Sequence, residues 1–215
     1  MKHSTSAPDR RIFLVVTSAF ALAGCSGLIG PPDAAQVVYL LRANSAPSSG
    51  PRVGWALAIN RPDASDSLDT DRIALMHSDI ITDYYAGAVW SDQLPDLVQT
   101  ALLAGFQGSG RIDAVTRNQD ALHADYVLDV DIRDFSAHYS SAANAPSVAV
   151  TLVAQIATAH GRGIVSTFTA NQMVPATANS VDAVVTAFNT AMAAAVQAIL
   201  GWALALPSPT ASTAG

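Results

Sequence analysis

Two stretches of the chain gather enough carboxylates to raise the question of metal binding or acid–base chemistry. One covers residues 129–134 and the other covers residues 63–71. Zinc sites need histidine or cysteine ligands at defined spacing, and calcium loops need several oxygens on one tight turn. Neither stretch has such a pattern. We therefore interpret the first as the solvated face of a strand, and the second as a solvated loop in which Asp69 or Asp71 caps a local turn or pairs with Arg72.

The other reactive residue types exclude whole classes of enzyme. The sequence contains no glutamate, and its only lysine is Lys2. A P-loop, Schiff-base catalysis and an HExxH metalloprotease site each require one of these residues. The histidines are scattered, and no GxSxG motif frames a nucleophilic serine. We predict a protein that is not an enzyme and that holds neither a cofactor nor a metal.

The charge balance narrows the range of partners. The formal net charge is −6, from 17 acidic residues, all aspartate, and 11 basic ones. Nucleic-acid-binding proteins usually present a basic surface, so we expect no nucleic-acid partner. Half of the residues are hydrophobic, which raises the separate question of contact with a membrane.

The N-terminus has the organisation of a signal peptide. Lys2, Arg10 and Arg11 form a positive leader, and the apolar run that follows, residues 12–23, is too short for the roughly 20 residues that span a bilayer. The run ends in Leu-Ala-Gly-Cys, which resembles a bacterial lipobox. Because Cys25 is the only cysteine of the chain, the resemblance implies that lipid is attached there.

We predict a signal peptide over residues 1–24 and a tether over residues 25–35 that begins with acylated Cys25. Several acyl chains anchor a protein stably, because each buried CH₂ contributes about 0.8 kcal/mol. The alternative is an ordinary secretory signal with an incidental cysteine. In many inner-membrane lipoproteins of Gram-negative bacteria, the residue directly after the lipidated cysteine is aspartate. In this chain that residue is Ser26. This difference favours the outer membrane, facing the periplasm.

The rest of the chain is predicted to form a series of strands and two helices. Period-two alternation is strongest over residues 126–139, where an irregularity at 134–135 indicates a bulge. The other expected strands cover residues 37–41, 54–60, 73–76, 80–85, 112–116, 148–156 and 164–174, with a hairpin turn at 77–79 and a second turn at 160–163. A helix is expected to start at Leu94-Pro95-Asp96 and to end between Gly105 and Gly110.

A final apolar segment, residues 180–204, has two interpretations. It carries no charge after Asp182, so it fits a membrane span by composition. Its large apolar side chains fall on one helical face, whereas its polar side chains fall on the other, as in a helix that docks on a core. We favour the core helix, with Asn179 or Ser180 as its N-cap.

These elements predict the α+β class. We expect an antiparallel sheet with two main helices packed on one face, forming a single domain over residues 36–205. The last ten residues, 206–215, are poor in large apolar side chains and are expected to form a disordered tail.

The chain resembles the ABC-type transport auxiliary lipoprotein family, which includes the paraquat-inducible lipoprotein C. The resemblance extends over nearly the whole mature chain as a distributed pattern. Its matching residues are Tyr39-Leu40-Leu41, Leu68, Asp71-Arg72-Ile73, Tyr84-Tyr85, Ala88, Trp90, Leu94-Pro95, Gln99, residues 124–128 running to Phe135, Asp182–Val185, Ala187-Phe188-Asn189, Ala191 and Trp202.

The resemblance implies a role as accessory component of a lipid-transport system. Its partners would be a periplasmic MCE-domain (mammalian cell entry) protein and an ABC permease with its ATPase, with a homo-oligomer compatible but not required. Tyr84, Tyr85 and Trp90 are candidates for an aromatic partner contact, the alternative being that they lie in the core. Two other functions remain open: a lipid-binding carrier with a pocket under the final helix, and a regulatory lipoprotein that activates a cell-wall enzyme.

Overall fold

The computed structural model describes residues 36–43, 49–78, 80–117, 124–159 and 163–207. The predicted signal peptide, Cys25 and the tether lie outside these residues. So do Asp79, most of the turn expected at 160–163, and residues 208–215 of the expected tail. Of that tail the structure describes two residues, and the Tyr126 hydroxyl donates a hydrogen bond of 3.0 Å to the carbonyl of Pro207.

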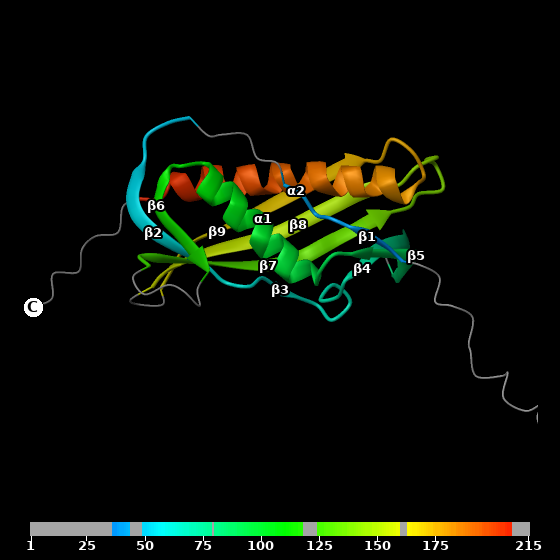
Figure 1. Cartoon of the computed structure of the whole chain (residues 1–215), viewed down its shortest axis with the longest axis horizontal. Helices are drawn as coiled ribbons and strands as arrows, with labels where there is room; N and C mark the ends of the chain where they lie inside the picture. The colour runs from blue at the N-terminus through cyan, green and yellow to red at the C-terminus, as the bar shows by residue number, and fades with distance from the viewer. Residues whose placement is uncertain (1–35, 44–48, 79, 118–123, 160–162, 208–215) are drawn as a thin grey trace, which may run out of the picture. The chain divides into compact units, whose positions relative to one another are not determined.

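The described residues form two long helices and nine strands (Figure 1). Each expected strand and helix is present, with β3 as an addition. The elements are β1 Val37–Tyr39, β2 Val53–Ile59, β3 Asp63–Ala64, β4 Arg72–Ser78, β5 Ile81–Trp90, α1 Leu94–Gly108, β6 Ile112–Arg117, β7 Tyr126–His138, β8 Ser147–Thr158, β9 Ile164–Pro175 and α2 Val181–Leu204.

Strand β7 organises the sheet. Along one edge it pairs with β8 over its whole length, and β8 pairs in turn with β9. Along its other edge it pairs successively with β2, β3 and β4. The register of β7 on β8 shifts between Ile132 and Asp134, which confirms the bulge indicated by the sequence. The antiparallel meander β7–β8–β9 and the antiparallel hairpin β4–β5 are also confirmed.

The prediction of an antiparallel sheet is wrong, because the sheet is mixed. Strands β2, β3 and β4 all run parallel to β7, as do β1 to β5 and β2 to β6. The chain lays down β2, β3 and β4 in one direction and then crosses back through α1 before β6 and β7 begin. Such a crossover allows parallel pairing, whereas a tight hairpin allows only antiparallel pairing.

Both helices lie over the same face of the sheet, and α1 also packs against α2 (Figure 1). The core beneath them is continuous, and it takes the inward side chains of the central strands together with one face of each helix. On β7 these are Tyr126, Leu128, Val130 and Ile132, as the alternation predicts. The other face of the sheet carries the polar side chains of the same strand.

Helix α2 is long and apolar enough to cross a membrane on length and composition, but 56% of its most apolar window is buried inside the domain. Phe188, Met192 and Ile199 are fully buried, and the helix packs against β8 and β9. The Ser180 hydroxyl accepts a hydrogen bond from the amide of Ala183, so Ser180 is the N-cap. The structure thus agrees with a core helix, and its apolar face is used in core packing.

Candidate functional site

The three aromatic residues considered for a partner contact lie in different environments. Tyr84, Tyr85 and Trp90 all belong to β5, where neighbouring side chains face opposite sides of the sheet. The two tyrosines are partly buried, and Trp90 is only 2% exposed. The structure therefore does not gather the three into one exposed cluster.

Trp90 lies in an aromatic core cluster with Phe135 of β7 and Phe188 of α2. Its ring meets Phe188 edge to face at a centroid distance of 5.4 Å and Phe135 at 6.1 Å. The two phenylalanine rings stack at 4.8 Å. These contacts join β5, β7 and α2, which corresponds to the core alternative for Trp90.

Tyr85 begins a chain of hydroxyl contacts toward the start of α2. Its hydroxyl lies 2.9 Å from that of Tyr139, which donates to the side-chain oxygen of Asn179 at 2.8 Å. Burial and the bond to Tyr139 both raise the pKa of Tyr85. Tyr85 is therefore neutral at physiological pH, and it holds β5 against the loop that precedes α2.

Tyr84 is the aromatic residue that takes part in a surface contact with a cation. The guanidinium carbon of Arg72 lies 3.6 Å from the centre of its ring, and its hydroxyl donates to the carbonyl of Ser67 at 3.0 Å. A cation–π contact of this kind is worth about 0.5–1 kcal/mol where it is exposed. Of the three aromatic candidates, Tyr84 is thus the one that a partner could reach together with a charged side chain.

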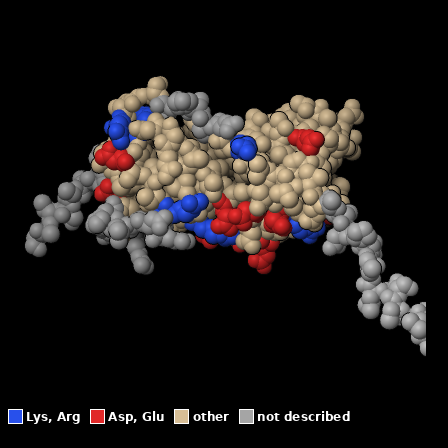
Figure 2. Space-filling view, viewed as in Figure 1, with Lys and Arg blue, Asp and Glu red and all other residues tan. Residues whose placement is uncertain are grey.

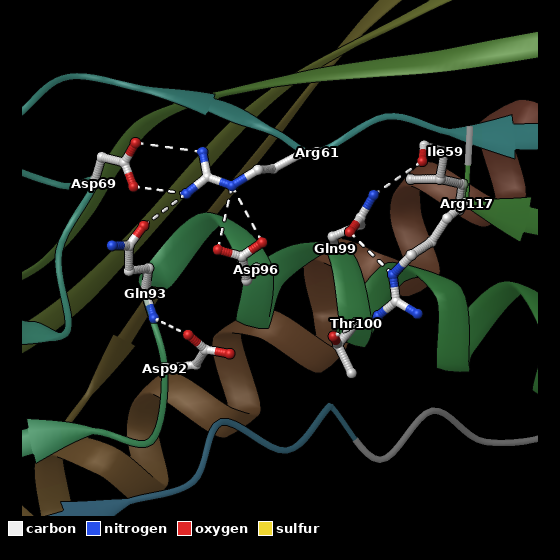
Figure 3. A network of polar contacts seen from close by, with 9 residues as sticks. All are labelled: Ile59, Arg61, Asp69, Asp92, Gln93, Asp96, Gln99, Thr100 and Arg117. Carbon is white, nitrogen blue, oxygen red and sulfur yellow. Dashed lines mark hydrogen bonds and ion pairs between the residues drawn. The ribbon is translucent and has the colours of Figure 1, made fainter. Parts of the chain in front are cut away.

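The most extensive polar network of the described surface centres on Arg61, which follows β2 (Figure 3). Its guanidinium donates to both carboxylate oxygens of Asp69, at 2.8 and 3.3 Å, and to those of Asp96 at 3.1 and 3.2 Å. It also donates to the side-chain oxygen of Gln93 at 3.0 Å. Arg61 thereby joins β2, the loop before β4 and the first turn of α1. The sequence left open whether Asp69 or Asp71 caps a local turn or pairs with Arg72. In the structure Asp69 pairs with Arg61, and Arg72 lies over Tyr84.

Replacing Arg61 with methionine is expected to lower the free energy of unfolding by about 1 kcal/mol near neutral pH, because several partly exposed charges lose one shared partner. The bond from Arg61 lowers the pKa of Asp69. Its stabilisation is therefore complete above the ordinary aspartate pKa of about 3.9 and is lost as the pH falls through the lowered folded value. Urea unfolding from pH 7 to pH 2 should show the two proteins converging in stability.

Arg52 provides the matched control for this experiment. It makes one ion pair, 3.5 Å from Asp113, and both side chains are more than half exposed. Arg52→Met should therefore change the free energy of unfolding by less than about 0.5 kcal/mol. An equal loss in both variants, or no convergence at low pH, would contradict a structural role for the Arg61 network.

A second polar contact is made by Gln99, a residue of α1 (Figure 3). Gln99 is 6% exposed. Its amide nitrogen donates to the carbonyl of Ile59 at 3.0 Å, and its oxygen accepts from the Nε of Arg117 at 3.2 Å. The side chain of Gln99 therefore satisfies the last carbonyl of β2 and joins β2, β6 and α1.

Gln99→Met should cost about 1–3 kcal/mol of stability, because it leaves a buried carbonyl without its donor. Gln107 is the matched control in α1. It donates to the carbonyl of Val115 at 2.8 Å but is exposed, so that water can replace it. Thermal unfolding should show a clearly smaller loss for Gln107→Met than for Gln99→Met, and the reverse order would refute the role of burial.

A Ser–His–Asp group exists on the outer face of β7, but its geometry does not form a catalytic relay. The Nε2 of His138 lies 2.8 Å from Asp134 and 3.1 Å from the hydroxyl of Ser136, which itself donates to Asp134. A relay needs the carboxylate and the hydroxyl on opposite ring nitrogens. Here both contact the same nitrogen, so the three side chains form a closed polar cluster.

This cluster borders a pocket of about 390 Å³ on the face of the sheet opposite the helices. Its other lining residues come from the loop after β3 and from β4 and β5, and include Ser65, Leu68, Met76 and Thr82. Arg133 of β7 also lines it, so the lining mixes hydroxyl and apolar groups with the side chains of Arg133, Asp134 and His138. Asp134 and His138 already contact each other and Ser136.

The aspartates of the 129–134 stretch lie on this same face and pair locally. Asp131 forms an ion pair of 2.7 Å with Arg133, and Asp129 accepts a hydrogen bond from the side chain of Asn60. Among the residues that the structure describes, no group of three or more histidine, cysteine or acidic side chains is placed to hold a metal ion. The stretch is a solvated strand face, as its alternation predicts.

The segment that enters the domain from the N-terminal side is fixed to α2. The hydroxyl of Tyr39 donates to Asp182 at 2.6 Å, and this bond raises the pKa of Tyr39. The amide of Arg42 donates to the side-chain oxygen of Asn189 at 2.8 Å. Residues 37–42 thus cross from the β5 edge to the exposed side of the last helix.

Comparison with known families shows which kind of protein has this scaffold. The family described as the ABC-type transport auxiliary lipoprotein component matches residues 39–200. The chain belongs to this family. The resemblance inferred from the sequence is therefore confirmed. The family is one of auxiliary lipoprotein components of ABC-type transport, and a lipoprotein family implies the cell envelope.

Two individual proteins are similar to this auxiliary lipoprotein at between a quarter and a third sequence identity. An uncharacterized protein of Bradyrhizobium diazoefficiens is 29% identical over 191 residues, which cover 84% of this chain and 48% of that protein. The chain thus spans about half the length of that relative. A crystal structure of a Xanthomonas campestris protein of the DUF330 family is 26% identical, with a TM-score of 0.74 over 78% of this chain and 94% of that one.

A second solved structure shares the fold of the auxiliary lipoprotein at lower identity. It is an uncharacterized protein that is 13% identical, with a TM-score of 0.62 over 79% of this chain and 99% of that chain. The architecture of a mixed sheet with two helices on one face therefore recurs in proteins of distant sequence.

The sequence did not point to Arg61, Gln99 or Tyr139 as organising residues. Gln99 does appear among the family-like positions, but its buried contact with the Ile59 carbonyl could not be read from spacing. Arg61 follows a strand and precedes a proline, a context typical of an ordinary loop. No local signal indicates that it would meet the first turn of α1.

Proposed function

We propose that this chain is the docking lipoprotein of an MCE-type ABC system that transports phospholipid or another lipid between the inner and outer membranes. The observation that carries the proposal is the family match over residues 39–200, which joins a lipoprotein to ABC-type transport. The acyl chains on Cys25 would hold the domain at the outer membrane, facing the periplasm. The domain itself would supply the contact with an MCE-domain protein and its permease and ATPase.

The properties of the domain support a role in positioning. Its polar networks at Arg61, Gln99 and Tyr85 join elements of the scaffold to one another, and the Asp134–Ser136–His138 cluster lacks the geometry of a relay. A tethered domain raises the effective concentration of a weak partner contact by geometry alone. We therefore infer a structural contribution to transport and no catalytic one.

Tyr84 is the aromatic residue that we assign to the partner contact. It combines a partly exposed ring with the guanidinium of Arg72, and tyrosine and arginine are both enriched at interface hot spots. Tyr85 and Trp90 are directed elsewhere, Tyr85 to the hydroxyl of Tyr139 and Trp90 to the core rings Phe135 and Phe188. The assignment of the contact thus narrows from three residues to one aromatic–cation pair.

Crosslinking of the intact envelope tests this function. An affinity-tagged full chain, treated with a membrane-permeant crosslinker before purification, should recover an MCE-domain protein together with the permease or ATPase. Tyr84→Ala should reduce that recovery, whereas Tyr84→Phe, which keeps the ring, should not. Repeated recovery of other proteins with no MCE-domain protein would overturn the proposal.

Lipid analysis separates docking from the carrier function. Because the apolar face of α2 is packed against β8 and β9, the purified protein should contain no lipid beyond its own acyl chains. Mass spectrometry under native conditions measures this directly. Phospholipid bound in a fixed ratio would favour the carrier, and altered peptidoglycan in a deletion strain would favour the regulator of a cell-wall enzyme.

A further inference from the structure

One edge of the sheet ends in a long strand that pairs on one side only. Strand β9, Ile164–Pro175, pairs with β8 and with no other described strand. Its register with β8 is regular from Ser166 to Pro175. The backbone groups on its outer side therefore form a template for one more strand.

Proteins usually protect such edges, and the opposite side of this sheet follows the rule. There the terminal strands are short: β1 has three residues and β6 has six. Strand β6 also carries Asp113 and Arg117, and edge charges disfavour pairing with another chain. Strand β9 has twelve residues with no charge, and its only proline is the last residue. Of the three terminal strands, β1, β6 and β9, only β9 is neither short nor charged.

The charges of the whole chain are distributed in the same uneven way. From Ser147 to the C-terminus the sequence has two charged residues, Arg162 and Asp182, although the chain as a whole has 28. Strands β8 and β9 have none. On the face drawn in Figure 2, most charged side chains likewise lie along one margin and at one end, and the others are isolated. An acidic protein can approach a copy of itself most easily through such an uncharged flank.

The exposed side chains of β9 have the same order of apolar and polar character on both sides of Thr169, although the residues themselves differ. The odd-numbered residues from Val165 to Met173 face away from the core and are exposed. Their order is Val165, Thr167, Thr169, Asn171 and Met173. An antiparallel copy centred on Thr169 would place valine opposite methionine, threonine opposite asparagine, and Thr169 opposite itself. Apolar pairs and hydroxyl pairs directly across strands stabilise a sheet.

We propose that β9 pairs antiparallel with β9 of a second copy of this chain, about a twofold axis at Thr169. The pairing extends the sheet across the two copies and covers Val165 and Met173, which are 39% and 64% exposed in the single chain. It follows from the edge, its neutral surroundings and its symmetry, and it does not depend on the proposed transport function. Attachment of both copies to one membrane would strengthen the contact by raising their effective concentration.

Disulfide crosslinking tests the register in the native envelope. Cross-strand partners lie about 4.5–5.5 Å apart between Cα atoms, within disulfide range, whereas residues displaced by four positions lie about 13 Å apart. Full-length Thr169→Cys should therefore form at least about tenfold more disulfide dimer than Thr167→Cys, which faces position 171 of the other copy. The double variant Thr167→Cys, Asn171→Cys should form the dimer again. The parent chain, whose only cysteine is Cys25, shows the background.

Equal crosslinking of Thr167→Cys and Thr169→Cys, or none from any variant after maleimide labelling has shown the thiols to be reactive, would overturn the proposal. A second measurement avoids cysteine altogether. Light scattering of the detergent-solubilised protein should give the mass of a dimer, and Thr169→Lys should halve it, because two like charges then meet at the axis. Thr186→Lys, on the exposed side of α2, should leave the dimer intact. A Thr169→Lys protein that keeps its circular dichroism spectrum and its dimer mass would contradict the interface.

Discussion

Replacing Trp90 with alanine is expected to lower the free energy of unfolding by about 3–5 kcal/mol. Trp90 is 2% exposed and contacts both Phe135 and Phe188, so its removal leaves a cavity at the point where β5, β7 and α2 meet. Its amide also donates to the carbonyl of Asp71 at 2.6 Å, a bond that the substitution keeps. Urea unfolding followed by far-ultraviolet circular dichroism measures the loss. Domains of this size have a total stability of about 5–15 kcal/mol, so the variant would be close to unfolding.

Two further variants show whether Trp90 acts through the core. Trp90→Phe should lose clearly less stability, because a smaller ring still fills part of the cluster. Tyr84→Ala should also lose less, because that ring is partly exposed. If Trp90→Ala unfolded like the parent protein but no longer crosslinked to an MCE-domain protein, Trp90 would be a partner contact and its placement in the core would be wrong.

Replacing Cys25 with alanine is expected to release nearly all of the protein from the membrane fraction. The substitution removes the sulfur that would receive the diacylglycerol, and with it the acyl chains, each contributing about 0.8 kcal/mol per buried CH₂. No other described element substitutes for this anchor, since α2 is packed into the domain. Fractionation of the envelope with detection of the protein in each fraction measures the effect.

Ser26→Asp is the matched control for the Cys25 variant. It leaves the cysteine in place, so the protein should stay with membranes but move from the outer to the inner membrane on a density gradient. Unchanged membrane retention of Cys25→Ala would mean that the chain is held by something other than acyl chains. Release of Cys25→Ala with no change for Ser26→Asp would support the anchor and leave the outer-membrane assignment without its basis.

The elements that could be predicted from the sequence are those whose own residues carry a long periodic pattern. Tyr126, Leu128, Val130 and Ile132 alternate with polar residues in β7, and the irregularity of the bulge is visible in the same stretch. The apolar stripe of α2 likewise distinguishes a core helix from a span, because a core helix must segregate its side chains. Such patterns are local, and local structure follows from them.

The parallel pairing of the sheet could not be predicted in this way. Whether β7 pairs with β2, β3 and β4 in the parallel or the antiparallel sense depends on the crossover through α1. Periodicity is the same for both directions, since side chains alternate with period two in each. The sequence could indicate strands and their faces, but their direction depended on contacts between distant parts of the chain.

The contacts of the candidate site also divide into those that the sequence indicates and those that depend on the finished fold. Neighbouring residues Tyr84 and Tyr85 must face opposite sides of a strand, and this follows from the sequence alone. That Arg72 would lie over Tyr84, leaving Asp69 to Arg61, depends on which side chains the finished fold brings within reach. Arg61 contacts Asp69 eight positions away and Asp96 thirty-five positions away. Only the second contact requires α1 to be docked, and no spacing rule indicates it.

The attachment of β1 determines how the domain would respond to mechanical load. Under the proposed anchoring, any pull between the outer membrane and the transport partner enters the domain at Val37. Strand β1 has only three residues paired with β5, but its last residue, Tyr39, donates to Asp182 of α2, and the amide of Arg42, three residues later, donates to Asn189 of the same helix. Tension would therefore be shared between the edge of the sheet and the helix that closes the core. Under tension, the pairing of β1 with β5 and the two hydrogen bonds to α2 would have to break before the pull reached the hydrophobic interior.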